Sequence, residues 1–313
     1  MNIFELFGLP ADHREHPFQL VKHLDEVPVS KISFPVYGQV KRDGVFAAAV
    51  CTGEQCHIFN RTGKKMTNVE ALESRYSNFP RGIYLGELQT LAIDAYLEGL
   101  SGIVNPNRVE PLNDFQQQMK DMLYIDFFDM LTFKAFVDGH TTVTFCQRYD
   151  ALVRRLKHLL QLLDDSILPI TKLNSFDEVH EYAETHIKAG REGAVFKHDC
   201  DYESGHKGWR QFKIVRGVNY DLLCVDWEEG SGKYKGKVAN LIFKWKGGKT
   251  VKAMLGRGWT HDDARHMFLE IQLGHSTPVG KIFAVKALQE SSKGVLRLPK
   301  AGECRHDKES PDV

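Results

Sequence analysis

The sequence has few of the features that mark secreted, membrane-bound or disulfide-linked proteins. Its six cysteines are scattered and form no CxxC pair, which excludes the usual structural zinc motifs and a disulfide framework. No stretch approaches the roughly 20 consecutive apolar residues that a membrane helix needs. The first residues, MNIFELFGLPADHREH, are too polar for a secretory signal. We therefore expect a protein without a membrane segment that acts in a reducing, cytoplasmic compartment.

The chain also lacks net charge, but its charges are unevenly distributed. Residues 1–204 contain 21 Lys and Arg against 29 Asp and Glu, whereas residues 205–313 contain 20 against 12. This basic excess towards the C-terminus indicates contact with a polyanion such as nucleic acid. A solvated, lysine-rich surface gives the same composition, so charge alone leaves both interpretations open.

Hydrophobic patterning divides the chain into a mixed α/β part and a smaller β part. Strand-like and helix-like runs follow one another up to residue 217, with the clearest strands at 36–40, 45–50, 81–91 and 123–130 and the clearest helices at 144–163 and 176–189. From residue 218, short alternating runs with glycine-rich joints predict a small antiparallel barrel, interrupted by one helix over 260–273. We expect an α+β first domain of mixed antiparallel sheets over 1–217, and a β-barrel over 218–313.

Lys41 is the first candidate for chemistry. It stands in Lys-Arg-Asp-Gly at 41–44, between two strand-like runs whose interiors normally exclude such a cluster. In a pocket, nearby cations and loss of solvent lower the pKa of a lysine and make its amine a nucleophile. The tetrapeptide also fits an ordinary surface turn, and alone it does not decide between the two.

Further charged residues lie on strand-like segments downstream. Glu87 interrupts an apolar run, Glu192 and Lys197 bracket Glu-Gly-Ala-Val-Phe-Lys, and Lys213 ends Trp-Arg-Gln-Phe-Lys. Buried carboxylates and lysines are costly unless they pair or meet a ligand. Each residue alone is explained by a strand edge or a structural ion pair. Together with Lys41 they suit a phosphate and a divalent cation.

The order of these motifs resembles that of the covalent nucleotidyltransferase superfamily. The matching segments are K-x-D-G at 41–44, N-R-T-G-K at 60–64, G-E-L at 86–88, Phe128-Asp129, E-G-x-V-x-K at 192–197, W-x-x-x-K at 209–213 and the tail L-R-L-P at 296–299 with Arg305–Lys308. The last of these resembles the ligase branch best. The chain is thus similar to ATP-dependent DNA ligases of the small two-domain kind found in bacteriophages, DNA viruses and some bacteria. The resemblance implies a nucleotidyltransferase (adenylation) domain followed by an OB-fold.

The resemblance also implies roles around the nucleotide. Lys41 would attack the α-phosphate of ATP and carry AMP. Gln39 stands where the family contacts adenine, and Phe128 would stack on that base. Arg61 would contact the nucleotide or the DNA 5′-phosphate.

The remaining matches concern metal and phosphate. Glu87 would contact the ribose, a metal or both, and Glu192 would help to hold Mg²⁺ (or Mn²⁺). Lys197 and Lys213 would neutralise the α-phosphate as charge develops.

The tail and the basic barrel complete what the resemblance implies. Arg305 and Lys308 would orient the pyrophosphate during the first step only. The expected partner is nicked double-stranded DNA, and the mechanism needs only a monomer. Three alternatives stay open: an mRNA capping guanylyltransferase, an RNA ligase, and a non-catalytic nucleic-acid clamp that has kept the fold.

Two positions depart from the family pattern. Ligases commonly carry Arg five residues after the nucleophile, where this chain has Phe46. The first lysine of the usual W-x-K-x-K is Gln211, which leaves Lys213 as the motif's single lysine. The first departure raises the question of which cation meets the phosphate, with Arg42 as a candidate.

Overall fold

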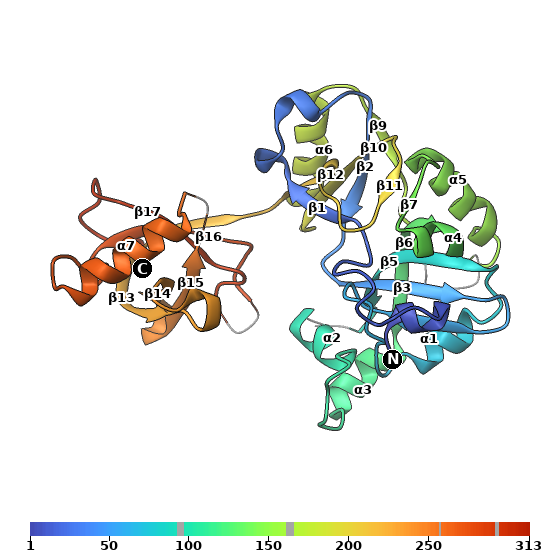
Figure 1. Ribbon diagram of the computed structural model, residues 1–313, viewed down its shortest axis with the longest axis horizontal. Helices are drawn as coiled ribbons and strands as arrows, with labels where there is room; N and C mark the ends of the chain where they lie inside the picture. The colour runs from blue at the N-terminus through green and yellow to red at the C-terminus, as the bar shows by residue number, and fades with distance from the viewer. Residues whose placement is uncertain (93–96, 161–165, 257, 292–293) are drawn as a thin grey trace. The chain divides into compact units, whose positions relative to one another are not determined.

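The computed structural model describes residues 1–92, 97–160, 166–256, 258–291 and 294–313. These residues form two compact units, Met1–Val215 and Arg216–Val313 (Figure 1). The boundary predicted from the sequence, after residue 217, is two residues C-terminal to this division after Val215. Within the described residues, no helix is both long and apolar enough to cross a membrane.

The first unit contains a five-stranded sheet that carries Lys41 at the end of its second-to-last strand. Its order is β1 (Leu20–His23), β12 (Lys207–Val215), β10 (Gly193–His198), β2 (Val36–Lys41) and β9 (Thr171–Leu173). Helix α6 (Phe176–Lys188) packs against it through Val179 and Ala183, which share a core cluster with Phe196 and Phe212. The apolar positions of the predicted helix and strands explain this layer.

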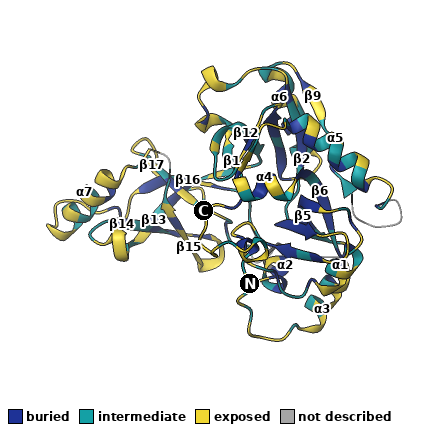
Figure 2. Ribbon diagram, turned by 45° about the vertical axis from the view of Figure 1, so that its right-hand side comes forward, coloured by how far each residue is buried: buried dark blue, intermediate teal, exposed yellow. Residues whose placement is uncertain are grey.

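A second five-stranded sheet lies in the same unit. Its order is β4 (Cys56–Phe59), β3 (Val45–Cys51), β5 (Gly82–Thr90), β6 (Leu123–Leu131) and β8 (Ser166–Ile167). Because side chains alternate along a strand, Ala47 and Ala49 belong to one core cluster while Phe46 and Ala48 belong to the other. Both faces are therefore covered, and β3 is a continuous apolar run. The neighbouring strands β5 and β6 are largely buried (Figure 2).

Helices cover the two faces of this second sheet unequally. One face is packed by α1 (Glu70–Arg75), α2 (Leu97–Ile103), α3 (Asp114–Asp121) and α5 (Phe145–Leu156). The other is packed by α4 (Phe133–Asp138) and the N-terminal segment. A short ladder of β7 (His140–Thr141) and β11 (Tyr202–Glu203) lies apart from both sheets. The helix predicted over 144–163 ends at Leu156, and residues 161–165 lie outside the described residues.

The second unit is a closed five-stranded barrel. Its strands follow the order β13 (Val218–Glu229), β14 (Val238–Lys244), β15 (Thr250–Leu255), β17 (Lys300–Cys304) and β16 (Ile282–Ala287). Helix α7 (His261–Gln272) lies between the third and fourth strands along the chain. Strand order and helix position match an OB-fold. The predicted fold class, an α+β domain followed by an OB barrel, is confirmed. Strand β17 went unpredicted because Lys-Ala-Gly-Glu-Cys lacks an alternating pattern.

Candidate active site

A pocket in the first unit is lined by side chains from both sheets. Its empty volume is about 720 Å³, which includes open solvent at its mouth. Four cations and two acids line it, namely Lys41, Arg42, Arg61, Lys197, Glu87 and Asp129. The excess of cations suits an anionic ligand. The structure therefore gathers six predicted residues in one pocket: Gln39, Lys41, Arg61, Glu87, Phe128 and Lys197.

Lys41 forms the central polar contact of this site. It is the last residue of β2, and its Cα partner in β10 is Gly193. This register brings Lys41 next to Glu192, so that the Lys41 Nζ lies 2.6 Å from the Glu192 Oε2. The Lys41 side chain is 20% exposed and that of Glu192 is 8% exposed. The amine is thus held by a carboxylate and stays accessible from the pocket.

The glycines of two motifs are required by close packing around Lys41. A Cβ at Gly44 would lie 2.4 Å from the Leu88 carbonyl oxygen and 2.8 Å from the Glu87 Cγ. Gly193 has a φ of +147°, and a Cβ there would lie 2.2 Å from the Ile214 carbonyl oxygen. Only glycine lets β5 and β12 approach the Lys41 segment this closely. The motif spacing therefore has a physical cause in the packing of the strands.

Glu87 extends from β5 directly opposite Phe46 of β3. Burial raises the pKa of Glu87 to about 7, and the negative charge of Glu192 acts in the same direction. The positive charges of Lys41 and Arg61 oppose this shift. Glu87 and Glu192 are thus close enough for their charges to interact. Such a pair of carboxylates fits Mg²⁺, which usually binds one or two carboxylates together with substrate phosphates. No cluster of three metal-binding side chains is found among the residues that the structure describes.

Gln39 and Lys197 lie at the more buried end of the pocket. The Gln39 side chain is 2% exposed, and its amide nitrogen donates to the Leu168 carbonyl at 3.1 Å. The Lys197 Nζ lies 4.7 Å from the centre of the Phe128 ring and donates to the Phe128 carbonyl at 3.3 Å. Burial lowers the pKa of Lys197 to about 8. Among the residues that the structure describes, no carboxylate contacts this amine directly, although the charge of Asp129 partly opposes the shift.

The two departures from the family pattern both lie at the pocket. Phe46 and Gln211 are lining residues, and Gln211 is the Cα partner of Lys197. Lys213 is not among the lining residues. Its pKa is lowered by burial and then by the charge of Lys41, so the two cations act on each other. Arg42 lines the pocket but is tied to Asp126, with its Nε 2.8 Å from the Asp126 Oδ2.

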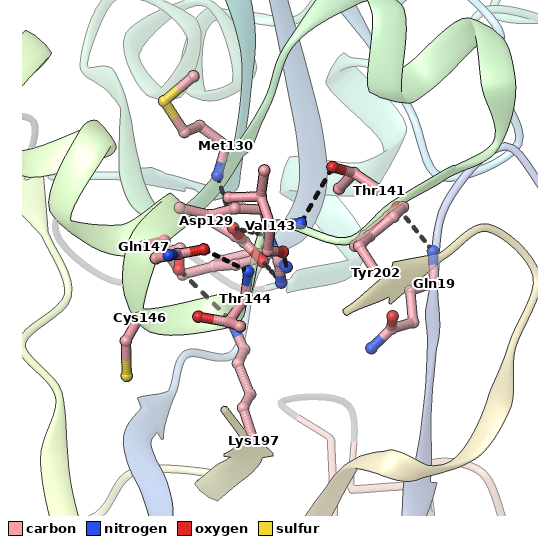
Figure 3. A network of polar contacts seen from close by, with 12 residues as sticks. Gln19, Asp129, Met130, Thr141, Val143, Thr144, Cys146, Gln147, Lys197 and Tyr202 are labelled. Carbon is pink, nitrogen blue, oxygen red and sulfur yellow. Dashed lines mark hydrogen bonds and ion pairs between the residues drawn. The ribbon is translucent and has the colours of Figure 1, made fainter. Parts of the chain in front are cut away.

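A buried polar network beside Phe128 was not assigned from the sequence. Asp129 accepts from the Arg148 Nε and Nη2, each at 3.0 Å, and both side chains are 7% exposed. The Arg148 guanidinium lies 5.3 Å from the ring centre of Tyr202, a pocket residue whose hydroxyl accepts from the Gln19 backbone (Figure 3). One feature of the sequence could have indicated this network. Arg148 is the single charged residue on the otherwise apolar face of α5, alongside Phe145 and Leu152.

Arg305 and Lys308 belong to the second unit and are held there by acids. The Arg305 Nη1 lies 3.0 Å from each carboxylate oxygen of Asp221, and the Lys308 Nζ lies 3.2 Å from one of them. A second contact joins Arg305 to Asp307, whose pKa it lowers to about 2. These two cations are gathered into one charged cluster, and their role towards a nucleotide stays a prediction.

Comparison with known proteins agrees with this geometry. The model of the ATP dependent DNA ligase domain matches residues 19–214, and that of the DNA ligase OB-like domain matches residues 229–305. A probable DNA ligase of Beutenbergia cavernae is 27% identical over 214 residues, which are 64% of this chain and 38% of that protein. The chain thus spans well under half the length of this curated relative.

Solved structures show the same fold. Pmar-Lig_PreS3 matches with a TM-score of 0.72 at 17% identity, over 96% of this chain and 69% of that one. A structure from a study of Lig E DNA ligases and their DNA binding with a minimal scaffold matches with a TM-score of 0.65 at 18% identity, over 92% and 98%. Because the first family model covers more than half of the residues and includes Lys41, the chain belongs to the family of ATP-dependent DNA ligase domains.

Proposed function

We propose that this protein is an ATP-dependent DNA ligase that seals nicks in duplex DNA through a covalent Lys41–AMP intermediate. The contact between the Lys41 Nζ and the Glu192 Oε2 at 2.6 Å, in a pocket with three further cations, carries the proposal. An oriented amine next to fixed positive charge is what attack on a phosphate requires.

In the first step, the Lys41 Nζ forms a bond to the α-phosphorus of ATP while the bond to pyrophosphate breaks. Lys41 must give up a proton, and the Glu192 carboxylate, 2.6 Å away, is its nearest acceptor among the described residues. Lys197 and Lys213 would neutralise the developing charge, and Arg305 and Lys308 would hold the leaving pyrophosphate. Gln39 and Phe128 would hold the adenine.

Glu87 and Glu192 are the residues that would hold Mg²⁺ or Mn²⁺, together with phosphate oxygens of the nucleotide. The ion would supply further positive charge against the triphosphate. The raised pKa of Glu87 supports this assignment, because an under-compensated carboxylate gains most from a cation.

In the later steps, AMP passes from Lys41 to the 5′-phosphate of the nick, so a phosphoramidate bond breaks as a phosphoanhydride forms. The 3′-hydroxyl then attacks that phosphate and AMP leaves. Such chemistry needs contacts to the DNA backbone and no reading of bases. The exposed turn between β13 and β14 supports this part of the proposal, because Lys233 and Lys235 flank Tyr234 there, and the Lys233 Nζ lies 5.3 Å from the Tyr234 ring centre. A monomer suffices.

The test is transfer of label to the protein. With α-labelled ATP and Mg²⁺, wild type should carry label through denaturing electrophoresis, and Lys41→Ala should carry none. Lys172→Ala is the matched control, because Lys172 is an exposed lysine on the neighbouring strand β9 and should leave labelling intact. Label from GTP alone would indicate a capping enzyme instead.

The substrate is tested separately. Lys41→Ala should fail on an ordinary nick yet close a nick that is already adenylylated, because only the first two steps need the amine. Nicked duplex DNA should be sealed faster than nicked RNA. Salt-sensitive DNA binding without any adduct would favour the non-catalytic clamp.

A further inference from the structure

Phe46 stands where related ligases commonly have an arginine, and the structure shows what this ring contacts. The Phe46 side chain is 8% exposed and lies in a core cluster, 5.0 Å from the Phe18 ring centre. The Phe128 ring centre lies 6.2 Å from that of Phe46, and a cation also contacts the Phe46 ring. The Arg61 guanidinium carbon lies 4.6 Å from the centre of the Phe46 ring. This distance is within the range of an attractive contact between a cation and a ring face.

The backbone of Arg61 is fixed from the other side by its turn. The Asn60 side-chain oxygen accepts from the backbone nitrogens of Thr62 and Lys64, each at 3.0 Å. The Gly63 backbone nitrogen donates to the Asn60 carbonyl at 2.9 Å. Both ends of Arg61 are therefore held, although the residue as a whole is exposed. A long side chain that is already ordered loses less entropy when it binds an anion.

The guanidinium is held close to the reacting groups. Arg61 lines the pocket with Lys41, and its charge acts on the pKa values of both Glu87 and Lys213. Since Phe46 is the cross-strand partner of Glu87, the ring lies beside a carboxylate that is proposed to hold the metal ion. An arginine at position 46 would instead bury a second cation against Phe18 and its cluster.

We propose that Phe46 is a positioning residue that holds the Arg61 guanidinium at the pocket, so that one ordered arginine meets the substrate phosphate in place of two. This inference rests on the proposed function, since it assigns Arg61 to phosphate during adenylylation or ligation. It predicts that the contribution of Arg61 to the rate depends on the ring at position 46.

A double-mutant cycle tests the dependence. Phe46→Leu keeps apolar volume but removes the ring, and it should slow the Arg61-dependent step roughly two- to tenfold. In the Arg61→Ala background, Phe46→Leu should have no further effect on that step. Phe46→Tyr should restore the wild-type rate. Equal factors in both backgrounds would show that Phe46 only packs the core and would overturn the proposal.

Two further measurements keep the outcome clear. Phe136→Leu is the matched control, because Phe136 is a buried ring of the same cluster outside the pocket, and its effect should be the same with and without Arg61. In arginine-labelled protein, NMR should show side-chain protons of Arg61 shifted upfield by the ring, and the shift should vanish in Phe46→Leu. Absence of that shift in wild type overturns the inference. Absence of a Lys41 adduct in wild type contradicts the proposed function instead.

Discussion

The pKa values of charged groups in the pocket and on the barrel are shifted by different causes, burial in the pocket and ion pairing on the barrel. In the pocket, burial raises the pKa of Glu87 to about 7 and lowers that of Lys197 to about 8. On the barrel, the Arg305 guanidinium lowers the pKa of Asp307 to about 2, and the Glu290 carboxylate raises that of Lys246. The pocket pushes its groups towards neutrality, whereas pairing on the barrel favours the charged forms.

This difference distinguishes charged groups whose charge a bound ligand would compensate from charged groups that are already compensated by an ion pair. A phosphate or a metal ion entering the pocket would supply the compensation that Glu87 and Lys197 lack. Uncompensated charges in the pocket lower the stability of the fold and would favour binding of a ligand, as is common at functional sites. Three pocket residues are exceptions, since Asp129 pairs with Arg148, Lys41 with Glu192 and Arg42 with Asp126.

Asp129→Ala should cause the largest change in stability. It leaves Arg148, which is 6% exposed, without its counter-ion, and breaking a buried pair costs about 3–5 kcal/mol in the free energy of unfolding. Urea unfolding of the first unit measures the loss. The double variant Asp129→Leu/Arg148→Met should recover most of it, because no buried charge is left. A double variant as unstable as Asp129→Ala would contradict this account of the pair.

Lys197→Met should move stability in the other direction. Removing a poorly compensated buried cation should raise the free energy of unfolding by about 1–2 kcal/mol at pH 7, while adenylylation falls roughly 100-fold or more. Loss of stability together with activity would show that the ammonium supports the fold.

The pH dependence gives an independent check on Lys197. Its pKa is about 8 in the folded protein and about 10.5 when unfolded, so the unfolded state binds more protons between these values. Stability contributed by this residue should therefore rise with pH from about 8 to 10.5. The difference between wild type and Lys197→Met should shrink over that window. A constant difference would contradict the lowered pKa.

The sequence predicted the residues of the pocket better than their partners. Lys41, Glu87 and Lys197 were selected as a set, because these charged residues on strand-like segments follow the motif order of the family, whereas each alone is explained by a turn, a strand edge or an ion pair. Their spacing reflects strand packing, as the close approach at Gly44 shows. Tyr202 reaches the pocket from a short strand, β11, which belongs to neither five-stranded sheet. Such a position depends on tertiary packing and leaves no periodic signal.

The departure at Phe46 shows the same limit. From the sequence it was only a missing arginine, since nothing local connects residue 46 with residue 61. The antiparallel pairing of β3 with β4 brings the two together, because the turn that carries Arg61 follows β4 directly. Contacts of this kind require the register of the sheet, which depends on turn geometry as well as on the hydrophobic pattern.

Asp221→Asn should have a smaller, step-specific effect. It removes the charge that gathers Arg305 and Lys308, each within 3.2 Å of the Asp221 carboxylate. Because Arg305 and Lys308 would then be less well positioned, adenylylation should slow roughly tenfold. Phosphodiester formation at an adenylylated nick should keep its rate, because these residues are proposed to act on pyrophosphate alone. Equal slowing of both reactions would indicate a structural role for Asp221 in the barrel.

Glu290→Gln should have the smallest effect of all. The Lys246 Nζ lies 2.5 Å from the Glu290 Oε1, and the Tyr220 hydroxyl donates to the same oxygen at 2.9 Å. The Lys246–Glu290 distance is as short as that of the Lys41–Glu192 contact, but the side chains of Lys246 and Glu290 are 48% and 34% exposed. Water and salt screen such pairs, and glutamine keeps an acceptor for Tyr220. Thermal unfolding of the barrel and all three reaction steps should therefore be unchanged. If Glu290→Gln unfolded at a lower temperature than wild type, and if this difference were larger at low salt, pairing on the barrel would stabilise the fold. The contrast with the pocket would then fail.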